Sequence, residues 1–233
     1  MMYYYGTPDY LLFMLISIII TAIAQIKVKS AFAKYSKISN AKNLTGEEVA
    51  REILSSNNIT DIQVNKTHGE FTDFFDSSRK GVYLSDTVHS KATVASASVA
   101  AHECGHAIQN AKGYLPLKIR QTLVPITQIS SKMATPLIFI GLLLPTRYQF
   151  LVNAGIMLFS LAVFFQLVTL PVEFNASRRA LKAMQENNLL QDYEIVGAKK
   201  VLSAAALTYV ASLLTSLLSL LRLILIANSR RRD

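Results

Sequence analysis

Residues 94–110 read VASASVAAHECGHAIQN, and the rest of the chain is best interpreted outward from this stretch. Its small, mostly apolar residues predict a helix, on which His102 and His106 lie one turn apart on the same face. Two imidazoles at this spacing can bind one metal ion, and Glu103 beside them can act as a base toward water. The HExxH pattern is therefore typical of a zinc-dependent peptidase.

The alternative is a buried helix whose two histidines only contact neighbouring side chains. This is less favourable, because two histidines and an acid in an alanine-rich helix are costly to bury without a metal or polar partners. Cys104 is the only cysteine in the sequence. It lies about 200° around the helix from His102, so we expect it to pack rather than to bind metal.

A catalytic zinc needs a third protein ligand, because its fourth position is left to water. The best candidate is Glu173, which follows Pro171 at the end of a long apolar stretch, where a carboxylate needs compensation for its desolvation. Weaker candidates precede the motif: His68, His89, Asp73 and Asp76. Three residues are possible oxyanion donors: Arg178, Arg179 and Tyr114.

The composition predicts a protein embedded in a bilayer, because 51% of the 233 residues are hydrophobic and only 17% are charged. A hydrocarbon core of about 30 Å requires about 20 helical residues. Four apolar stretches are candidates, although the second is short and the fourth contains Arg222: residues 10–26, 133–144, 150–172 and 201–227.

The basic residues cluster beside these apolar stretches. A formal net charge of +9 would suggest nucleic acid as the partner of a soluble protein. Here Lys27 and Lys29 directly follow the first stretch, which is typical of topology signals and of contacts with anionic lipid headgroups. Because the charge follows the apolar run, we expect a retained anchor rather than a cleaved signal peptide. The predicted partners are the lipid bilayer and a protein or peptide substrate, with no nucleic acid.

The predicted fold is a mainly α integral membrane protein with about four transmembrane helices and a small cytosolic α+β zincin-like domain that carries the HExxH helix. Within that domain, Thr45 and Glu48 form a capping box. Three short strands are expected to form a β-meander, with residues 81–84 as a free edge that could pair with an extended peptide. Asp86 or Ser90 is expected to cap the HExxH helix, and Gly113 to end it.

The expected domain boundaries follow from these assignments. Pro116, Pro125 and Pro136 are expected to break the path toward the second span. The predicted segments are an N-terminal anchor (1–26), the cytosolic α+β domain (27–132), a transmembrane hairpin (133–172), a cytosolic segment with the third zinc ligand (173–200), and a C-terminal membrane helix with a basic tail (201–233).

Several segments, in this order, resemble the YugP-like membrane-bound neutral zinc metallopeptidases of bacteria: TGEEVAREIL (45–54), GVYLS (81–85), VAAHECGHAIQ (99–109), LPVEFNASRRAL (170–181) and AAALTYVA (204–211). The resemblance implies a gluzincin-type site, with His102, His106 and Glu173 as zinc ligands and Glu103 as the general base.

The chain is also similar in plan to membrane peptidases of the HtpX type, whose third ligand lies in an ExxxD pattern. Ser177 occupies the position of that aspartate here, and Asn175 lies between. The resemblance therefore implies that Asn175, Ser177 or another group orients a ligand histidine. Arg178 completes the set of candidates for orienting ligands or stabilising the oxyanion.

Together these features predict an integral-membrane zinc-dependent endopeptidase. It would hydrolyse peptide bonds with a zinc-bound water, and Glu103 would be the general base. The expected location is the bacterial cell membrane, which the chain would cross several times with its active site facing the cytosol. The alternative is a catalytically inactive metal-binding membrane scaffold of peptidase fold, against which the intact Glu103 argues.

Overall fold

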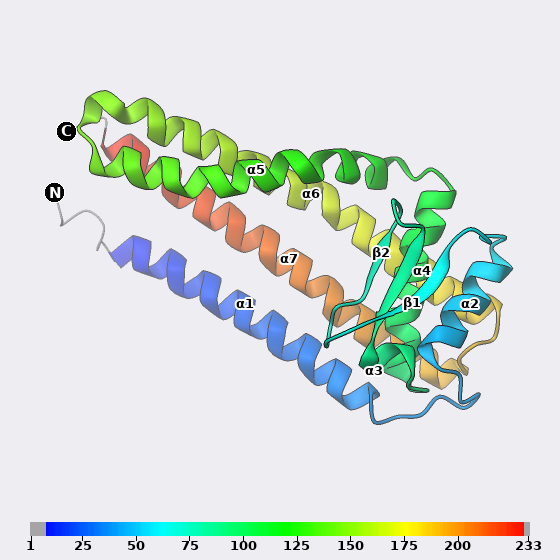
Figure 1. Ribbon diagram of the computed structural model, residues 1–233. Helices are drawn as coiled ribbons and strands as arrows, with labels where there is room; N and C mark the ends of the chain where they lie inside the picture. The colour runs from blue at the N-terminus through cyan, green and yellow to red at the C-terminus, as the bar shows by residue number, and fades with distance from the viewer. Residues whose placement is uncertain (1–7, 231–233) are drawn as a thin grey trace. The chain divides into compact units, whose positions relative to one another are not determined.

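The computed structural model describes residues 8–230, and its contacts divide the chain into two compact units. The apolar unit comprises Met1–Ala24, Ile119–Leu170 and Thr208–Asp233. The polar unit comprises Gln25–Lys118 and Pro171–Leu207. Four long helices contribute a part to each unit: α1 (Pro8–Tyr35), α5 (Leu115–Leu143), α6 (Gln149–Glu186) and α7 (Asp192–Ser229) (Figure 1).

Among the described residues, these four helices are long and apolar enough to cross a membrane. The part of α7 in the apolar unit, from Thr208 to Ser229, extends roughly 33 Å at 1.5 Å per residue, which matches the hydrocarbon thickness of a bilayer. The chain is therefore mainly helical with four candidate membrane spans, and this part of the predicted fold class is confirmed.

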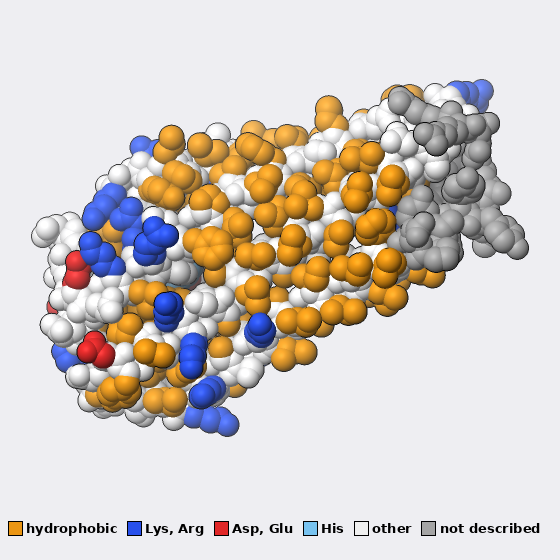
Figure 2. Space-filling view, turned by 180° about the vertical axis from the view of Figure 1, so that it is seen from behind, with side chains coloured by type: hydrophobic (Ala, Val, Ile, Leu, Met, Phe, Trp, Pro, Cys, Tyr) orange, Lys and Arg blue, Asp and Glu red, His pale blue; other side chains and the backbone are white. Residues whose placement is uncertain are grey.

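The helices of the apolar unit expose many large hydrophobic side chains (Figure 2). Ile18 is 56% exposed, Ile129 67% and Leu143 72%. Soluble monomeric proteins rarely expose extended apolar surfaces, because contact with water is unfavourable for them. The exposed side chains are suited to contact with lipid, which supports association with a membrane.

The expected helix break before the second span is wrong. Helix α5 begins at Leu115 and continues through Pro125 and Pro136. Prolines are tolerated in membrane-spanning helices more often than in soluble ones.

The C-terminal helix α7 is continuous, and Arg230, the residue that follows it, contacts the end of α5. The guanidinium of Arg230 donates to the carbonyl oxygens of Gly141 and Leu144. The final carbonyls of a helix have no partner within that helix, so Arg230 satisfies groups that would otherwise lack one. The rest of the predicted basic tail, Arg231 and Arg232, lies outside the described residues.

In the polar unit, helix α2 (Gly46–Ser56) begins with the predicted capping box, which is confirmed. The backbone N–H of Glu48 donates to Thr45 Oγ1 over 3.3 Å, and the N–H of Thr45 donates to Glu48 Oε2 over 2.8 Å. The apolar face of α2 is buried, with Val49 and Ile53 both inaccessible to solvent. This face packs against the helix that carries the motif.

The small sheet differs from the expected meander. Strands β1 (Gln63–Thr67), β2 (Phe74–Asp76) and β3 (Gly81–Ser85) have the order β1-β3-β2, with β3 parallel to β1 and antiparallel to β2. The most apolar strand takes the centre, where Val82 and Leu84 are fully buried. Because β3 is paired on both sides, the expectation that residues 81–84 form a free edge is also wrong.

Helix α4 (Val94–Ala111) carries the motif, and its N-terminus differs from the prediction. Thr93 is the capping residue, and its Oγ1 accepts from the N–H of Ser96 over 3.1 Å. Asp86 instead begins the separate short helix α3 (Asp86–His89), and Ser90 follows that helix. Gly113 lies just beyond the end of α4 with a φ of +62°, a conformation that favours glycine.

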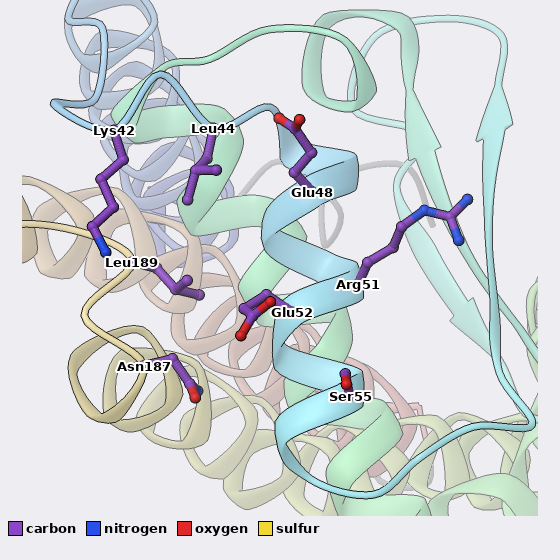
Figure 3. Close-up of a pocket in the computed structure, with 8 residues that line it drawn as sticks. All are labelled: Lys42, Leu44, Glu48, Arg51, Glu52, Ser55, Asn187 and Leu189. Carbon is purple, nitrogen blue, oxygen red and sulfur yellow. The ribbon is translucent and has the colours of Figure 1, made fainter.

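A hollow of about 580 Å³ lies beside α2 in the polar unit (Figure 3). Its lining carries charges of both signs, so it presents no strong net charge to a ligand. The lining residues are Lys42, Leu44, Glu48, Arg51, Glu52, Ser55, Asn187 and Leu189.

Candidate metal centre

Helix α4 brings the two histidines of the motif together within the polar unit. The ring centroids of His102 and His106 are 4.9 Å apart, and the rings are nearly perpendicular at 85°. Glu103 lies on the same helix and is only 8% exposed. These three polar residues therefore lie in a largely buried part of the protein, where unpaired charge is costly.

Cys104 is directed toward a different helix. Its thiol lies 3.6 Å from the carbonyl oxygen of Ala50 on α2, to which it can donate. Burial raises the pKa of the Cys104 thiol, so it stays protonated at neutral pH. Cys104 therefore packs between α4 and α2, as the sequence predicts, and is absent from the cluster formed by the histidines.

A close approach between α4 and α6 positions the third member of that cluster. A Cβ atom added to Gly105 would lie 2.4 Å from the carbonyl oxygen of Ala176. Only glycine permits this backbone separation. Glu173 precedes Ala176 by almost one helical turn, so the contact brings its carboxylate to the level of the histidines.

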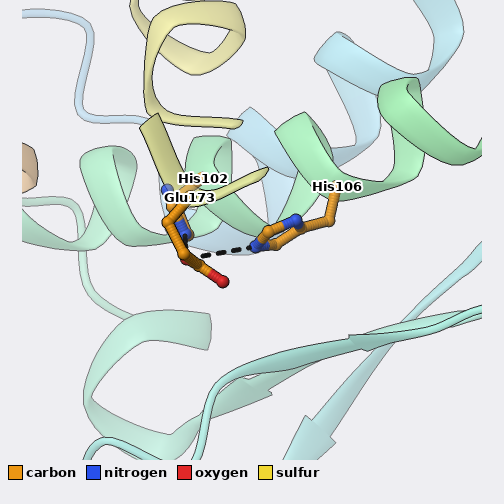
Figure 4. Close-up of side chains that lie close together, drawn as sticks. All are labelled: His102, His106 and Glu173. Carbon is orange, nitrogen blue, oxygen red and sulfur yellow. Dashed lines mark hydrogen bonds and ion pairs between the residues drawn. The ribbon is translucent and has the colours of Figure 1, made fainter. Parts of the chain in front are cut away.

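The carboxylate of Glu173 meets both imidazoles (Figure 4). Its Oε2 atom lies 3.3 Å from His102 Nε2 and 3.6 Å from His106 Nε2. One ligand atom from each of the three residues lies within 4.8 Å of the other two. Glu173 itself is 1% exposed. The structure thus brings together the three residues that the sequence nominates as metal ligands.

The hydrogen bonds around His106 define which of its nitrogens can bind a metal. Gln109 Nε2 donates to the carbonyl oxygen of Val172 over 2.8 Å and to Asn175 Oδ1 over 3.0 Å. Gln109 Oε1 then faces His106 Nδ1 at 3.1 Å and can only accept. His106 therefore carries its proton on Nδ1, and the lone pair of Nε2 is directed toward Glu173.

This arrangement fits a bound cation. Two acceptors, His106 Nε2 and Glu173 Oε2, face each other in a buried site, and they repel unless a proton or a cation lies between them. A single divalent ion satisfies both atoms and His102 at once. Two imidazoles and one carboxylate are a ligand set that zinc takes in catalytic sites, with one position left to water.

His102 is oriented by Ser177, whose Oγ lies 3.1 Å from His102 Nδ1. Ser177 occupies the position at which the related pattern has an aspartate. Asn175 contributes to the orientation of the other histidine, because it accepts a hydrogen bond from Gln109, whose Oε1 faces His106 Nδ1. Sequence reasoning missed Gln109, although its spacing of three residues from His106 on one helix is a usable signal.

The three candidate oxyanion donors do not join this cluster. Arg179 Nε donates to Asn175 Oδ1 over 2.7 Å, and its guanidinium lies 5.8 Å from the ring centroid of Tyr114. Arg178 is exposed and lines, with Tyr114, a groove that Asn175 and Ser177 also border. Neither Arg178 nor Arg179 is therefore placed as an oxyanion donor beside the metal ligands.

The four weaker ligand candidates also lie elsewhere. The side chain of His68 is 100% exposed, and His89 Nε2 lies 3.4 Å from Glu47 Oε2. Asp73 and Asp76 accept hydrogen bonds from neighbouring backbone N–H groups. Each of these side chains is accounted for by local contacts or by exposure to solvent.

Comparisons with known proteins agree with this geometry. A family model described as "Putative neutral zinc metallopeptidase" matches residues 10–228. The "Putative membrane protease YugP" of Bacillus subtilis (strain 168) is 46% identical over 203 residues, which are 87% of this chain and 89% of that protein. No solved structure matches this chain.

Proposed function

This chain belongs to the neutral zinc metallopeptidase family, and we propose that it is an integral-membrane zinc endopeptidase with an HExxH, gluzincin-type site. The observation that carries the proposal is the convergence of His102, His106 and Glu173, whose ligand atoms lie within 4.8 Å of one another. The name of the relative, a membrane protease, and the apolar helices support a location in the membrane.

The two histidines and Glu173 would hold the zinc ion. Zinc in such a site supplies Lewis-acid chemistry, because it polarises a carbonyl group and makes water a stronger acid. The surrounding residues keep the ligands in place: Ser177 orients His102, and Gln109 holds the proton of His106 on Nδ1. Preorganised ligands of this kind increase metal affinity.

Glu103 is proposed as the general base. Its carboxylate adjoins His102 in sequence and is largely buried, where a proton acceptor is weakly solvated. It would accept a proton from the attacking water and return that proton to the nitrogen of the leaving amine. A scaffold that only binds metal has no need of a carboxylate at this position.

The substrate is proposed to be a protein or peptide that binds in an extended conformation. β2 is an edge strand of the described sheet and packs against α4, whereas β3 is paired on both sides. The outer edge of β2 can therefore add a strand through main-chain hydrogen bonds. A peptide methylated at alternate main-chain nitrogens should be cleaved at least ten times more slowly than its parent, and equal rates would exclude strand pairing.

The bacterial cell membrane is the proposed location, with four spans and the metal site on the cytosolic side. Basic residues such as Lys27 and Lys29 lie in the polar unit, where the positive-inside tendency places them in the cytosol. Because Cys104 is buried, a cysteine introduced at Lys37 or Arg147 would be the reactive thiol. In intact cells, an impermeant maleimide should label Arg147→Cys and not Lys37→Cys, and the reverse result would invert the topology.

The experiment that tests the enzyme is zinc content measured together with cleavage of an unfolded protein, using detergent-solubilised protein. Glu103→Gln should keep its zinc and lose at least 100-fold in rate, because the base is lost while the ligands remain. Equal cleavage by Glu103→Gln would remove this residue from the mechanism. Zinc binding without cleavage by the unaltered protein would favour the scaffold.

A further inference from the structure

A second hollow in the polar unit lies between α6 and α7 and has a volume of about 740 Å³. Its lining combines two cations, Arg178 and Lys199, with the apolar side chains of Phe174 and Leu202. Ser203 adds a hydroxyl group. We propose that this α6–α7 groove binds the headgroup of an anionic phospholipid from the membrane surface.

The charge of the groove is the first support. Its lining contains no acidic residue. Within residues 8–230, neither Arg178 nor Lys199 forms an ion pair, whereas Lys182 on the same helix lies 3.5 Å from Glu186. The hollow beside α2 contains Glu48 and Glu52 as well as cations. Of these two hollows, the α6–α7 groove alone presents cations without acids, which favours an anion.

The position of the groove along its two helices is the second support. Pro171, in its lining, directly follows the last residue of α6 in the apolar unit, and Ala206 on α7 precedes Thr208 by two residues. Arg178 lies roughly 10 Å along the helix from Pro171. If the apolar parts cross a bilayer, the groove begins where the hydrocarbon core ends, in the layer that lipid phosphates occupy.

The two cations of the groove lie away from the metal ligands, although Asn175 and Ser177, which contact Gln109 and His102, also line the groove. Arg178 lies about 140° around α6 from Glu173, because five residues separate them. An occupant held by Arg178 and Lys199 is therefore on a different face of α6 from the metal ligands. A lipid with a phosphate between the two cations and its glycerol and upper acyl chain against Phe174 and Leu202 matches both parts of the lining.

The test uses native mass spectrometry of the detergent-purified protein, titrated with short-chain phosphatidylglycerol and, separately, with phosphatidylcholine of the same chain length. The unaltered protein should bind phosphatidylglycerol more tightly than phosphatidylcholine. The double variant Arg178→Gln/Lys199→Gln should lose about thirty-fold in affinity for phosphatidylglycerol, since each cation near a lipid surface contributes about a factor of five to six.

Lys182→Gln/Lys200→Gln is the matched control, because it removes the same charge from the same helices at positions outside the groove. It should change the affinity less than three-fold. The swap Arg178→Lys/Lys199→Arg keeps both charges and should retain the preference, which separates a charge effect from misfolding.

Three results would overturn the proposal. An equal loss in the matched control would assign lipid binding to diffuse surface charge. Inorganic phosphate that competes at the same concentration as phosphatidylglycerol would indicate a simple anion site rather than a lipid site. Displacement of the lipid by a short peptide, dependent on the peptide's free terminal carboxylate, would assign the groove to peptide. None of these readouts depends on zinc or proteolysis, so the proposed enzyme function stands or fails separately.

Discussion

Two buried carboxylates in the polar unit have opposite surroundings. Glu194 on α7 is 2% exposed, and backbone N–H groups of Ala41 and Gln191 donate to its two oxygens over 2.7 and 2.8 Å. Glu173 on α6 is 1% exposed, yet its Oε2 faces two imidazoles, one of which presents a lone pair. Glu194 is thus satisfied by the fold, whereas the Glu173 cluster is suited to a cation.

The largest expected difference between these two residues is in zinc affinity. Glu173→Gln should weaken zinc binding by more than about 100-fold while the protein stays folded, because a charged ligand is lost from a preorganised set. Competition with a chromophoric chelator measures the affinity. Glu194→Gln is the control and should remain within three-fold of the unaltered protein. Equal zinc affinities of the two variants would show that Glu173 is no more important for metal binding than Glu194.

The second difference is in folding stability. Glu194→Ala should lower the free energy of unfolding by about 2–3 kcal/mol, because it removes a buried carboxylate that accepts hydrogen bonds from the N–H groups of Ala41 and Gln191. Thermal unfolding in detergent measures the loss. Glu186→Ala removes an exposed carboxylate from α6 and should change stability by less than about 0.5 kcal/mol. A loss no greater than that of Glu186→Ala would show that Glu194 has no structural role.

The residues that orient the histidines should produce intermediate effects. Gln109→Ala should weaken zinc binding by about 10- to 100-fold, because His106 then loses the acceptor that holds its proton on Nδ1. Ser177→Ala should have the smaller effect, about ten-fold or less, since His102 loses a single hydroxyl contact. Zinc titration of both variants checks this order, and a Gln109→Ala variant with unchanged affinity would contradict the assignment of the His106 tautomer.

The features that the sequence predicts correctly depend mostly on contacts between residues that are close together in the chain. The capping box at Thr45 and the one-turn spacing of His102 and His106 are local, so they could be read from neighbouring residues. Glu173 could be nominated because a carboxylate at the end of an apolar stretch is unusual. Membership of the family could also be recognised from its motifs, and the comparisons confirm it.

The features that the sequence did not predict depend on distant partners. The central place of β3 reflects burial of Val82 and Leu84 against other elements, which strand patterns alone do not define. Helix α5 continues through Pro125 because its surroundings tolerate a missing N–H, and local propensity argues against such a helix. The spacing of Gln109 from His106 is a local signal, but the orientation of its amide depends on Val172 and Asn175 of α6, which accept from its Nε2.

The smallest expected effect is on the pH dependence of stability, and it comes from substitution of a third carboxylate, Asp73. Burial raises the pKa of the Asp73 carboxyl, although hydrogen bonds from Ser85 act in the opposite direction. A raised folded-state pKa contributes stability below the unfolded pKa, near 4, and this contribution is lost as the pH rises through the folded value. Position 73 cannot titrate in Asp73→Asn, so the change in unfolding temperature from pH 4 to pH 7 should be more positive in this variant than in the unaltered protein. The same change in both proteins would contradict this assignment.

The most direct test of the metal centre is X-ray absorption spectroscopy of the zinc-loaded protein. We expect a first shell of nitrogen and oxygen at about 2.0–2.2 Å, with the outer-ring scattering of two imidazoles and loss of this shell in Glu173→Gln. A sulfur neighbour near 2.3 Å, which would implicate Cys104, or an unaltered shell in Glu173→Gln would contradict it.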